Sequence, residues 1–124
     1  MKITELEVWK AGLDLSKSVF DLSEKFPANE SNGLSFQLRR AVTYIPSNIA
    51  AAASRKYGKE SLKYLSKAKA FLYETETLLY LAEKLRYINE QELEEIIESL
   101  DTSRRLLFGF IKYYKRSSSS TQAG

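Results

Sequence analysis

Apolar residues recur along this chain at steps of three and four, the spacing that places them on one face of an α-helix. Residues 34–53 show the pattern clearly, with Leu34, Leu38, Ala41, Ile45 and Ile49. Only two prolines and five glycines interrupt it, and no segment shows the alternation expected of a strand. The periodicity predicts helices near residues 5–26, 33–57, 59–87 and 89–116. Four such helices with short loops are typical of an all-α, antiparallel up-down-up-down four-helix bundle.

Pro46 lies inside the second predicted helix. A proline removes one backbone hydrogen bond and clashes with the preceding turn, at a cost of about 3 kcal/mol in a helix interior. Because the apolar period continues on both sides of Pro46, the sequence predicts a kink and not a break. Asn48 is expected to donate a hydrogen bond to the carbonyl that the proline leaves without a partner. Both residues are therefore interpreted as structural.

The ends of the predicted helices carry recognisable signals. Thr4 with Glu7, and Asn89 with Glu92, have the spacing of a capping box, which marks the start of a helix. Gly58 follows the second helix and suits the backbone conformation that ends one. These signals predict where the first and fourth helices begin and where the second ends.

The last residues differ in composition from the rest of the chain. Residues 117–124, SSSSTQAG, are small and polar, and we expect a disordered tail there. Residues 1–116 then form the single four-helix bundle domain that a chain of 124 residues predicts.

The composition excludes several classes of site. With no histidine and no cysteine, the chain has no histidine general base, thiol nucleophile or thiolate metal site. No glycine-rich phosphate loop is present, so we expect neither enzymatic activity nor a cofactor or metal. The chain also lacks a long apolar segment and a recognisable signal peptide, so we expect no membrane association and a cytoplasmic location.

The charge is small in total but unevenly distributed. The formal net charge is +3, yet residues 35–72 carry eight basic residues and one acid. Residues 73–101 carry nine acids and two basic residues, whereas residues 102–124 carry five basic residues and no acid. Such segregation predicts a polarised surface, or helices that pair by charge within a bundle or an oligomer.

One basic cluster has the spacing of a binding surface. Lys59, Lys63 and Lys67 follow one another at four-residue steps, which aligns them along one helical stripe. Arg55 and Lys56 precede them, so these five residues are the candidate nucleic-acid contacts. Phosphate backbones favour such clusters because each neutralised phosphate releases counterions. The alternative is a lysine-rich helix face that serves only solubility.

Arg39, Arg40, Glu74 and Glu76 are interpreted as structural. Adjacent arginines point about 100° apart on a helix, so one is expected on the surface and the other at a helix interface, paired with Glu74 or Glu76. The two acids are two residues apart and diverge, which argues against a pair of catalytic carboxylates. The eight tyrosines suit either base stacking or packing at helix and subunit interfaces.

Three segments carry a resemblance to a known family: LEVWKAGLDL, LSFQLRRAVTYIPSNIA and YLSKAKAFLYETETLLYLAEKLRYI. They resemble the proteins encoded in intervening sequences of bacterial 23S rRNA genes, over about residues 5–115. The resemblance implies a homopentamer of four-helix bundles. It also implies kinship with the accessory variability determinant proteins of diversity-generating retroelements, which associate with a reverse transcriptase and nucleic acid.

The sequence therefore favours a non-enzymatic, self-assembling helical bundle that binds RNA or DNA through a basic surface. The alternative is a structural or protein-interaction module in which the segregated charges serve subunit pairing.

Overall fold

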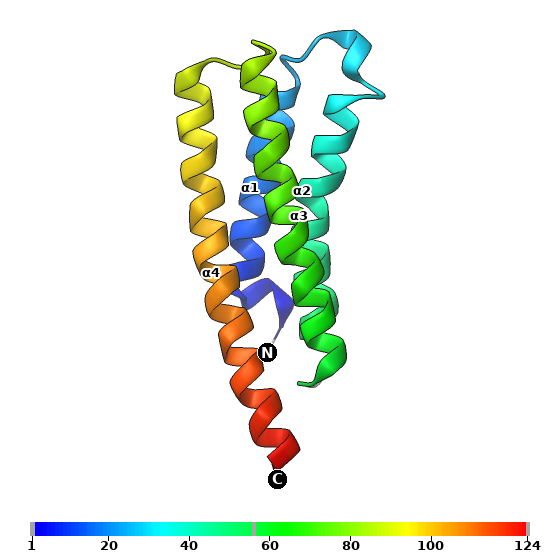
Figure 1. The fold of residues 1–124 in the computed structure, drawn as a ribbon, viewed down its shortest axis with the longest axis vertical. Coiled ribbons are helices and arrows are strands. Elements are labelled where there is room, and N and C mark those ends of the chain that lie inside the picture. The colour runs from blue at the N-terminus through cyan, green and yellow to red at the C-terminus, as the bar shows by residue number, and fades with distance from the viewer. Residues whose placement is uncertain (1, 56, 124) are drawn as a thin grey trace.

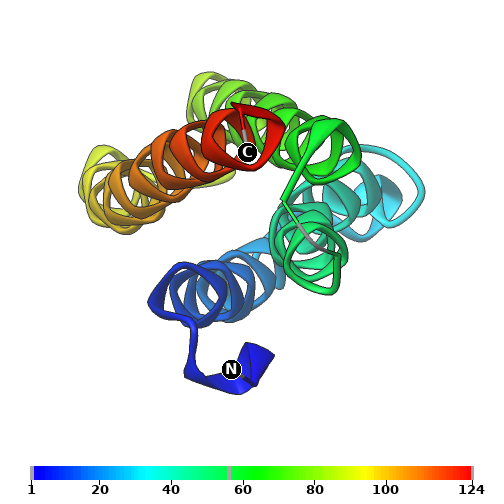
Figure 2. The same ribbon diagram turned by 90° about the horizontal axis from the view of Figure 1, so that it is seen from below.

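Helices dominate the computed structural model, which describes residues 2–55 and 57–123, with side chains as far as Ser118. They are α1 (Glu7–Ser23), α2 (Leu34–Ala53), α3 (Lys59–Lys84) and α4 (Glu90–Ala123). Two short 3-10 turns, η1 (Ile3–Glu5) and η2 (Ala28–Glu30), precede α1 and α2. Consecutive helices are antiparallel neighbours, and α4 also packs on α1 (Figures 1 and 2). No strand occurs in these ranges, so the predicted four-helix bundle is confirmed.

Buried side chains recur every seven residues, or two helical turns, along each helix. The series are Val8 and Leu15 on α1, Leu38, Ile45 and Ala52 on α2, Leu65, Leu72 and Leu79 on α3, and Leu100, Leu107 and Tyr114 on α4. Together they form one continuous core between the four helices. Replacing a fully buried leucine such as Leu72 by alanine is expected to cost about 2–5 kcal/mol of stability.

One of the two predicted capping boxes is present. The Glu92 backbone N–H donates to Asn89 Oδ1 at 2.8 Å, and the Asn89 N–H donates to Glu92 Oε1 at 2.9 Å. The box predicted for Thr4 is wrong, because Thr4 lies in η1 and α1 begins only after an extended residue, Leu6. The 3-10 turn separates Thr4 from the amides that it was expected to cap.

Two helix ends also differ from the expected positions. The α2 helix ends at Ala53, one turn before the predicted end near residue 57. The α4 helix continues to Ala123 and projects beyond the other helices, where a disordered tail had been expected from residue 117 (Figure 1). Ser118 is only 4% exposed, so the helix at this point still packs against its surroundings.

Pro46 lies within α2, which runs through it without a break as predicted. A Cβ atom added to Gly12 of α1 would lie 3.2 Å from the Pro46 Cβ, so the two helices approach closely here. The carbonyl of Val42, which Pro46 leaves without its usual donor, accepts a hydrogen bond from Ser16 Oγ at 3.2 Å. The expected role of Asn48 is therefore wrong, since its side chain donates to the Tyr44 carbonyl at 2.7 Å.

Glu30 links the α1–α2 connection to the α3–α4 connection at one end of the bundle. Its Oε1 accepts from the Leu34 backbone N–H at 3.1 Å, and its Oε2 accepts from the Tyr87 hydroxyl at 2.7 Å. The bond from Tyr87, with that from Leu34, lowers the pKa of Glu30, and the same contact raises the pKa of Tyr87. A Cβ at Gly33 would lie only 2.4 Å from Glu30 Oε1, so a side chain there would displace this oxygen from its hydrogen bond with Leu34.

Candidate nucleic-acid interface

The candidate interface begins at the short connection between α2 and α3. Gly58, with φ of 149°, occupies a region of backbone space that favours glycine, and α3 starts at the next residue. The turn returns the chain along α2, so that Arg55 lies beside the first two turns of α3.

Arg55 is held by contacts within the bundle. Its Nη1 donates to the Ala51 carbonyl at 2.6 Å, and its Cζ lies 4.5 Å from the centre of the Tyr64 ring. Its Nε is also 3.7 Å from Glu60 Oε1. Arg55 therefore joins the end of α2 to α3 and shares its charge with Glu60, which leaves it less available for a phosphate than the sequence suggested.

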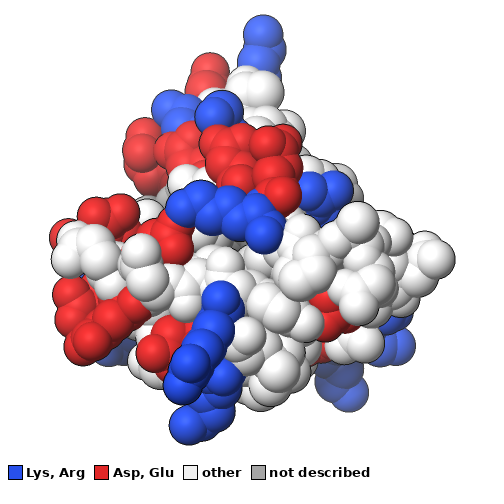
Figure 3. Space-filling model, turned by 90° about the horizontal axis from the view of Figure 1, so that it is seen from above, with Lys and Arg blue, Asp and Glu red and all other residues white. Residues whose placement is uncertain are grey.

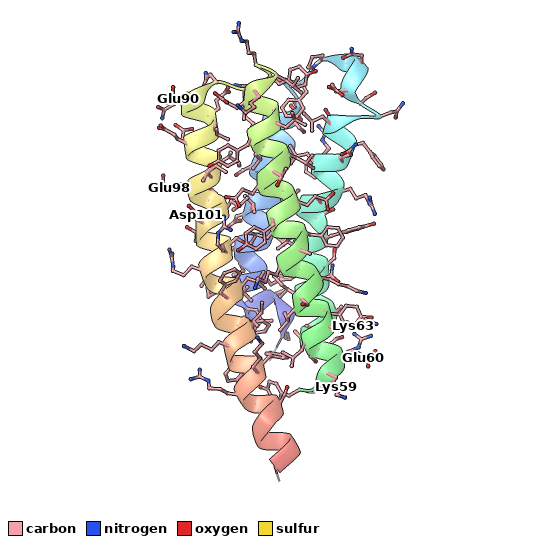
Figure 4. The ribbon with its side chains drawn as sticks, viewed as in Figure 1. Lys59, Glu60, Lys63, Glu90, Glu98 and Asp101 are labelled. Carbon is pink, nitrogen blue, oxygen red and sulfur yellow. The ribbon has the colours of Figure 1, made fainter. Side chains whose placement is uncertain are left out.

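Lys59, Lys63 and Lys67 are all exposed on the first half of α3. Figure 4 shows Lys59 and Lys63 projecting outward near the end of the bundle, with Glu60 between them. Lys67 Nζ lies 5.1 Å from the centre of the Tyr64 ring, and no described residue forms an ion pair with Lys59 or Lys63. The three lysines thus form the exposed stripe that their spacing predicts. Lys56 lies outside the described residues.

The second half of α4 adds basic side chains that the sequence prediction did not include. The antiparallel arrangement brings it beside the first half of α3. The hydroxyls of Tyr57, which lies just before α3, and Tyr113 of α4 are hydrogen-bonded at 2.7 Å. The exposed residues Lys112, Lys115 and Arg116 lie on this part of α4. Further along, Lys69 Nζ of α3 lies 5.0 Å from the Phe108 ring centre. We call Lys59, Lys63, Lys67, Lys112, Lys115 and Arg116 the basic end.

The opposite half of α4 is acidic. Glu90, Glu98 and Asp101 lie on its first half: Glu90 is at the other end of the bundle from Lys59 and Lys63, and Glu98 and Asp101 follow toward the middle (Figure 4). Seen from that end, acidic and basic side chains are intermixed (Figure 3). The alternating charge blocks of the sequence therefore become an axial separation along α3 and α4.

Arg39 and Arg40 separate as the sequence predicts, but neither pairs with the predicted acids. Arg40 is exposed, whereas Arg39 is partly buried between α1 and α2. There its Nε donates to Ser23 Oγ at 2.8 Å, and its Cζ lies 4.9 Å from the Phe20 ring centre. The expected ion pair with Glu74 or Glu76 is wrong because Arg39 faces α1.

Glu76 forms its ion pair with Arg104 of α4. The Arg104 Nη2 to Glu76 Oε2 distance is 2.8 Å, and both side chains are largely buried. Partial burial acts to lower the pKa of Arg104, but hydrogen bonds to Glu76, Tyr73 and Asp101 outweigh it and raise that pKa. Glu74, two residues before Glu76, is exposed, so the two acids diverge as expected.

The chemistry available at the basic end is anion binding. Its cations are amines and a guanidinium, and the aromatic rings near them belong to tyrosines and a phenylalanine. Among the described residues, no three acidic side chains are placed to hold a metal ion. None of the helices in those ranges combines the length and apolar character that crossing a bilayer requires.

Comparison with protein families identifies the family of this chain. The family model described as 23S rRNA-intervening sequence protein matches residues 4–109. The chain belongs to this family. The resemblance seen in the sequence is thereby confirmed, whereas the link to diversity-generating retroelements stays a prediction.

A solved structure shares the fold of this member of the 23S rRNA-intervening sequence protein family. The fold is similar to the crystal structure of a protein of unknown function from the S23 ribosomal protein family of Bacteroides thetaiotaomicron. The TM-score is 0.76 and the identity 26%, over 85% of this chain and 98% of that chain. Among curated proteins, none matches the chain.

Proposed function

We propose that this bundle binds RNA or DNA through the basic end and has no catalytic activity of its own. The observation that carries the proposal is the meeting of two basic segments, the first half of α3 and the second half of α4, at one end of the molecule. Its lysines are exposed, and no described residue forms an ion pair with Lys59 or Lys63. Such a surface neutralises several phosphates at once.

The test is a binding titration of a labelled nucleic acid at several salt concentrations. The wild-type affinity is expected to fall with salt, with a log–log slope of roughly −0.7 to −0.9 per phosphate neutralised. The variant Lys59→Glu/Lys63→Glu/Lys67→Glu should lose binding without unfolding, because the three positions are exposed and lie off the core.

A matched control changes the same charge elsewhere. The variant Lys17→Glu/Lys84→Glu/Arg86→Glu alters three exposed residues that lie outside the basic end. It should retain most of the affinity. Equal loss in both variants would mean that net charge alone drives binding, and an unaffected first variant would place the site elsewhere.

We also propose that the protein self-assembles, with the pentamer that the family resemblance implies. Large apolar side chains stay exposed on two sides of the bundle. They include Leu13, Phe20 and Phe36 on α1 and α2, and Tyr73, Tyr80, Leu81 and Phe108 on α3 and α4, with Leu85 directly after α3. Because the two sides differ, contact between them would be head-to-tail, which closes into a ring when the rotation permits.

These exposed apolar residues also favour the second candidate function, a structural or protein-interaction module. Light scattering at micromolar concentration separates the possibilities. An oligomer without nucleic-acid binding at low salt would support the interaction module, and a 14.2 kDa monomer would contradict self-assembly.

A further inference from the structure

Four aromatic side chains gather at the basic end. Tyr57, from the α2–α3 connection, packs on Tyr114 of α4 with ring centres 4.8 Å apart, and Phe110 packs on Tyr114 at 4.7 Å. Tyr113 meets Tyr57 edge-on at 5.7 Å, and the two hydroxyls are hydrogen-bonded. The cluster therefore joins the connection to the last turns of α4.

The cluster has a buried base and an open surface. Tyr114 is only 6% exposed, whereas Tyr57 is 38% and Tyr113 47% exposed. The hydrogen bond between their hydroxyls and the packing on Tyr114 fix both rings before any ligand arrives. Rings fixed in advance lose little conformational entropy on binding.

Basic residues are close neighbours in sequence of the two open rings. Lys59 follows Tyr57 by two residues, and Lys112 and Arg116 flank Tyr113 on α4. All three are exposed, and none forms an ion pair with a described residue. Aromatic faces among basic side chains are the combination that binds single-stranded nucleic acids without sequence preference.

Gly109 leaves space beside Tyr113. It lies one turn earlier on α4, on the side toward which side chains of a helix lean. Gly109 is exposed, and a Cβ placed there would meet no described atom within 4 Å apart from its chain neighbours and the backbone of its own helical turn, so even the Tyr113 side chain leaves this space open. Packing within the chain therefore does not require this glycine, although glycine weakens a helix. The absence of a side chain at Gly109 leaves the backbone accessible one turn from Tyr113, so that a planar group can approach the Tyr113 ring.

We propose that Tyr57 and Tyr113, whose rings stand at 77° to each other, each offer a face of a platform on which bases of a single-stranded RNA or DNA stack, while the basic residues near them in the chain hold its phosphates. This inference rests on the nucleic-acid binding proposed above and specifies the form of the ligand. In a duplex the base faces are covered by neighbouring bases, so only an unpaired strand can use the platform. Each stacked base is expected to strengthen binding roughly five- to 140-fold.

The test compares three ligands by fluorescence anisotropy: a labelled single strand, the same strand annealed to its complement, and a strand of equal length made of abasic sites. The abasic strand keeps the phosphates and removes the bases. The wild type should bind the normal strand at least roughly five-fold more tightly than the abasic strand, as expected for one stacked base. It should also prefer the single strand to the duplex.

Ring substitutions then locate the contact. Tyr57→Leu/Tyr113→Leu should lower the affinity for the normal strand to that for the abasic strand and leave abasic binding unchanged. Tyr57→Phe/Tyr113→Phe, which keeps both rings, should behave more like the wild type. Gly109→Gln fills the space beside Tyr113 without altering a ring and should weaken only the binding of the normal strand. Circular dichroism checks that each variant is folded, and Gly109→Gln gives an independent result if the leucine variant is not.

The outcomes separate this inference from the proposal on which it depends. Salt-dependent binding that is equal for normal and abasic strands overturns base stacking and leaves phosphate binding intact. A preference for the normal strand that survives in a folded leucine variant overturns the assignment to Tyr57 and Tyr113. Absence of binding to any strand at low salt overturns both.

Discussion

Ser16 of α1 donates a hydrogen bond from its Oγ to the carbonyl of Val42 in α2, 26 residues away in the chain. That carbonyl is the acceptor that Pro46 leaves without an N–H donor. The same hydroxyl also donates to the Gly12 carbonyl of its own helix at 2.8 Å, so the two carbonyls share its single proton. The proline is therefore accommodated by the neighbouring helix, and Gly12 and Ser16, one turn apart, provide the space and the donor.

Replacing Ser16 by alanine should destabilise the bundle by about 1–3 kcal/mol, because the buried Val42 carbonyl loses its donor. In a Pro46→Ala background the helix again supplies an N–H to that carbonyl, so the same replacement should cost less. Urea unfolding of the four proteins in this double-mutant cycle measures the difference. Equal costs in both backgrounds would show that Ser16 does not compensate for the proline.

Gly109→Ala should stabilise the protein by about 0.5–1 kcal/mol, because alanine is the better helix former and a Cβ at this exposed site meets no described neighbour. Gly12→Ala is the matched control. Its Cβ would lie 3.2 Å from the Pro46 Cβ, so the same change should be destabilising. The denaturant midpoint should rise relative to the wild type for Gly109→Ala and fall for Gly12→Ala. Shifts in the same direction would contradict the packing around Pro46.

Glu76→Gln should destabilise the bundle by about 1.5 kcal/mol, because Arg104 loses its shortest charged contact in a partly buried site. Arg104 would keep its contact of 3.1 Å with Asp101, which limits the loss. Glu74→Gln, two residues away and exposed, should have little effect. Thermal unfolding of the two variants compares them directly, and an equal change would show that the ion pair does not contribute.

Glu30→Gln should reduce stability at neutral pH, and the difference from the wild type should shrink in acid. The pKa of Glu30 is lowered in the folded state by the hydrogen bonds from Tyr87 and Leu34. Its contribution is therefore fully present above the unfolded pKa and is lost as the pH falls through the lower folded pKa. Unfolding free energies measured across this range test the sign, and a difference that grows toward low pH would contradict it.

The sequence predicts those features that depend on neighbouring residues in the chain. The seven-residue series through Leu65, Leu72 and Leu79 follows from helical periodicity alone, and the Asn89–Glu92 box from its spacing. Continuity of α2 through Pro46 was likewise evident from the apolar residues on both sides. Each of these is decided within one helix.

Contacts between helices were harder to predict. The partner of Glu76 is Arg104, not Arg39 or Arg40, because the choice depends on which helix each side chain faces. The hydrogen bond from Ser16 to the Val42 carbonyl likewise corresponds to no recognisable spacing in the sequence, because it joins two helices. The addition of Lys112, Lys115 and Arg116 to the candidate interface could have been anticipated by combining the charge blocks with the antiparallel topology.

The most direct test of the account is the salt dependence of single-strand binding by the wild type and by Lys59→Glu/Lys63→Glu/Lys67→Glu. If the basic end binds phosphates, the wild-type affinity falls linearly on log–log axes. Where the residual binding of the variant is measurable, its log–log slope should be shallower than that of the wild type by about 2 to 3. Wild-type affinity that is independent of salt, or a variant with the same slope and affinity as the wild type, would contradict the assignment of nucleic-acid binding to this surface.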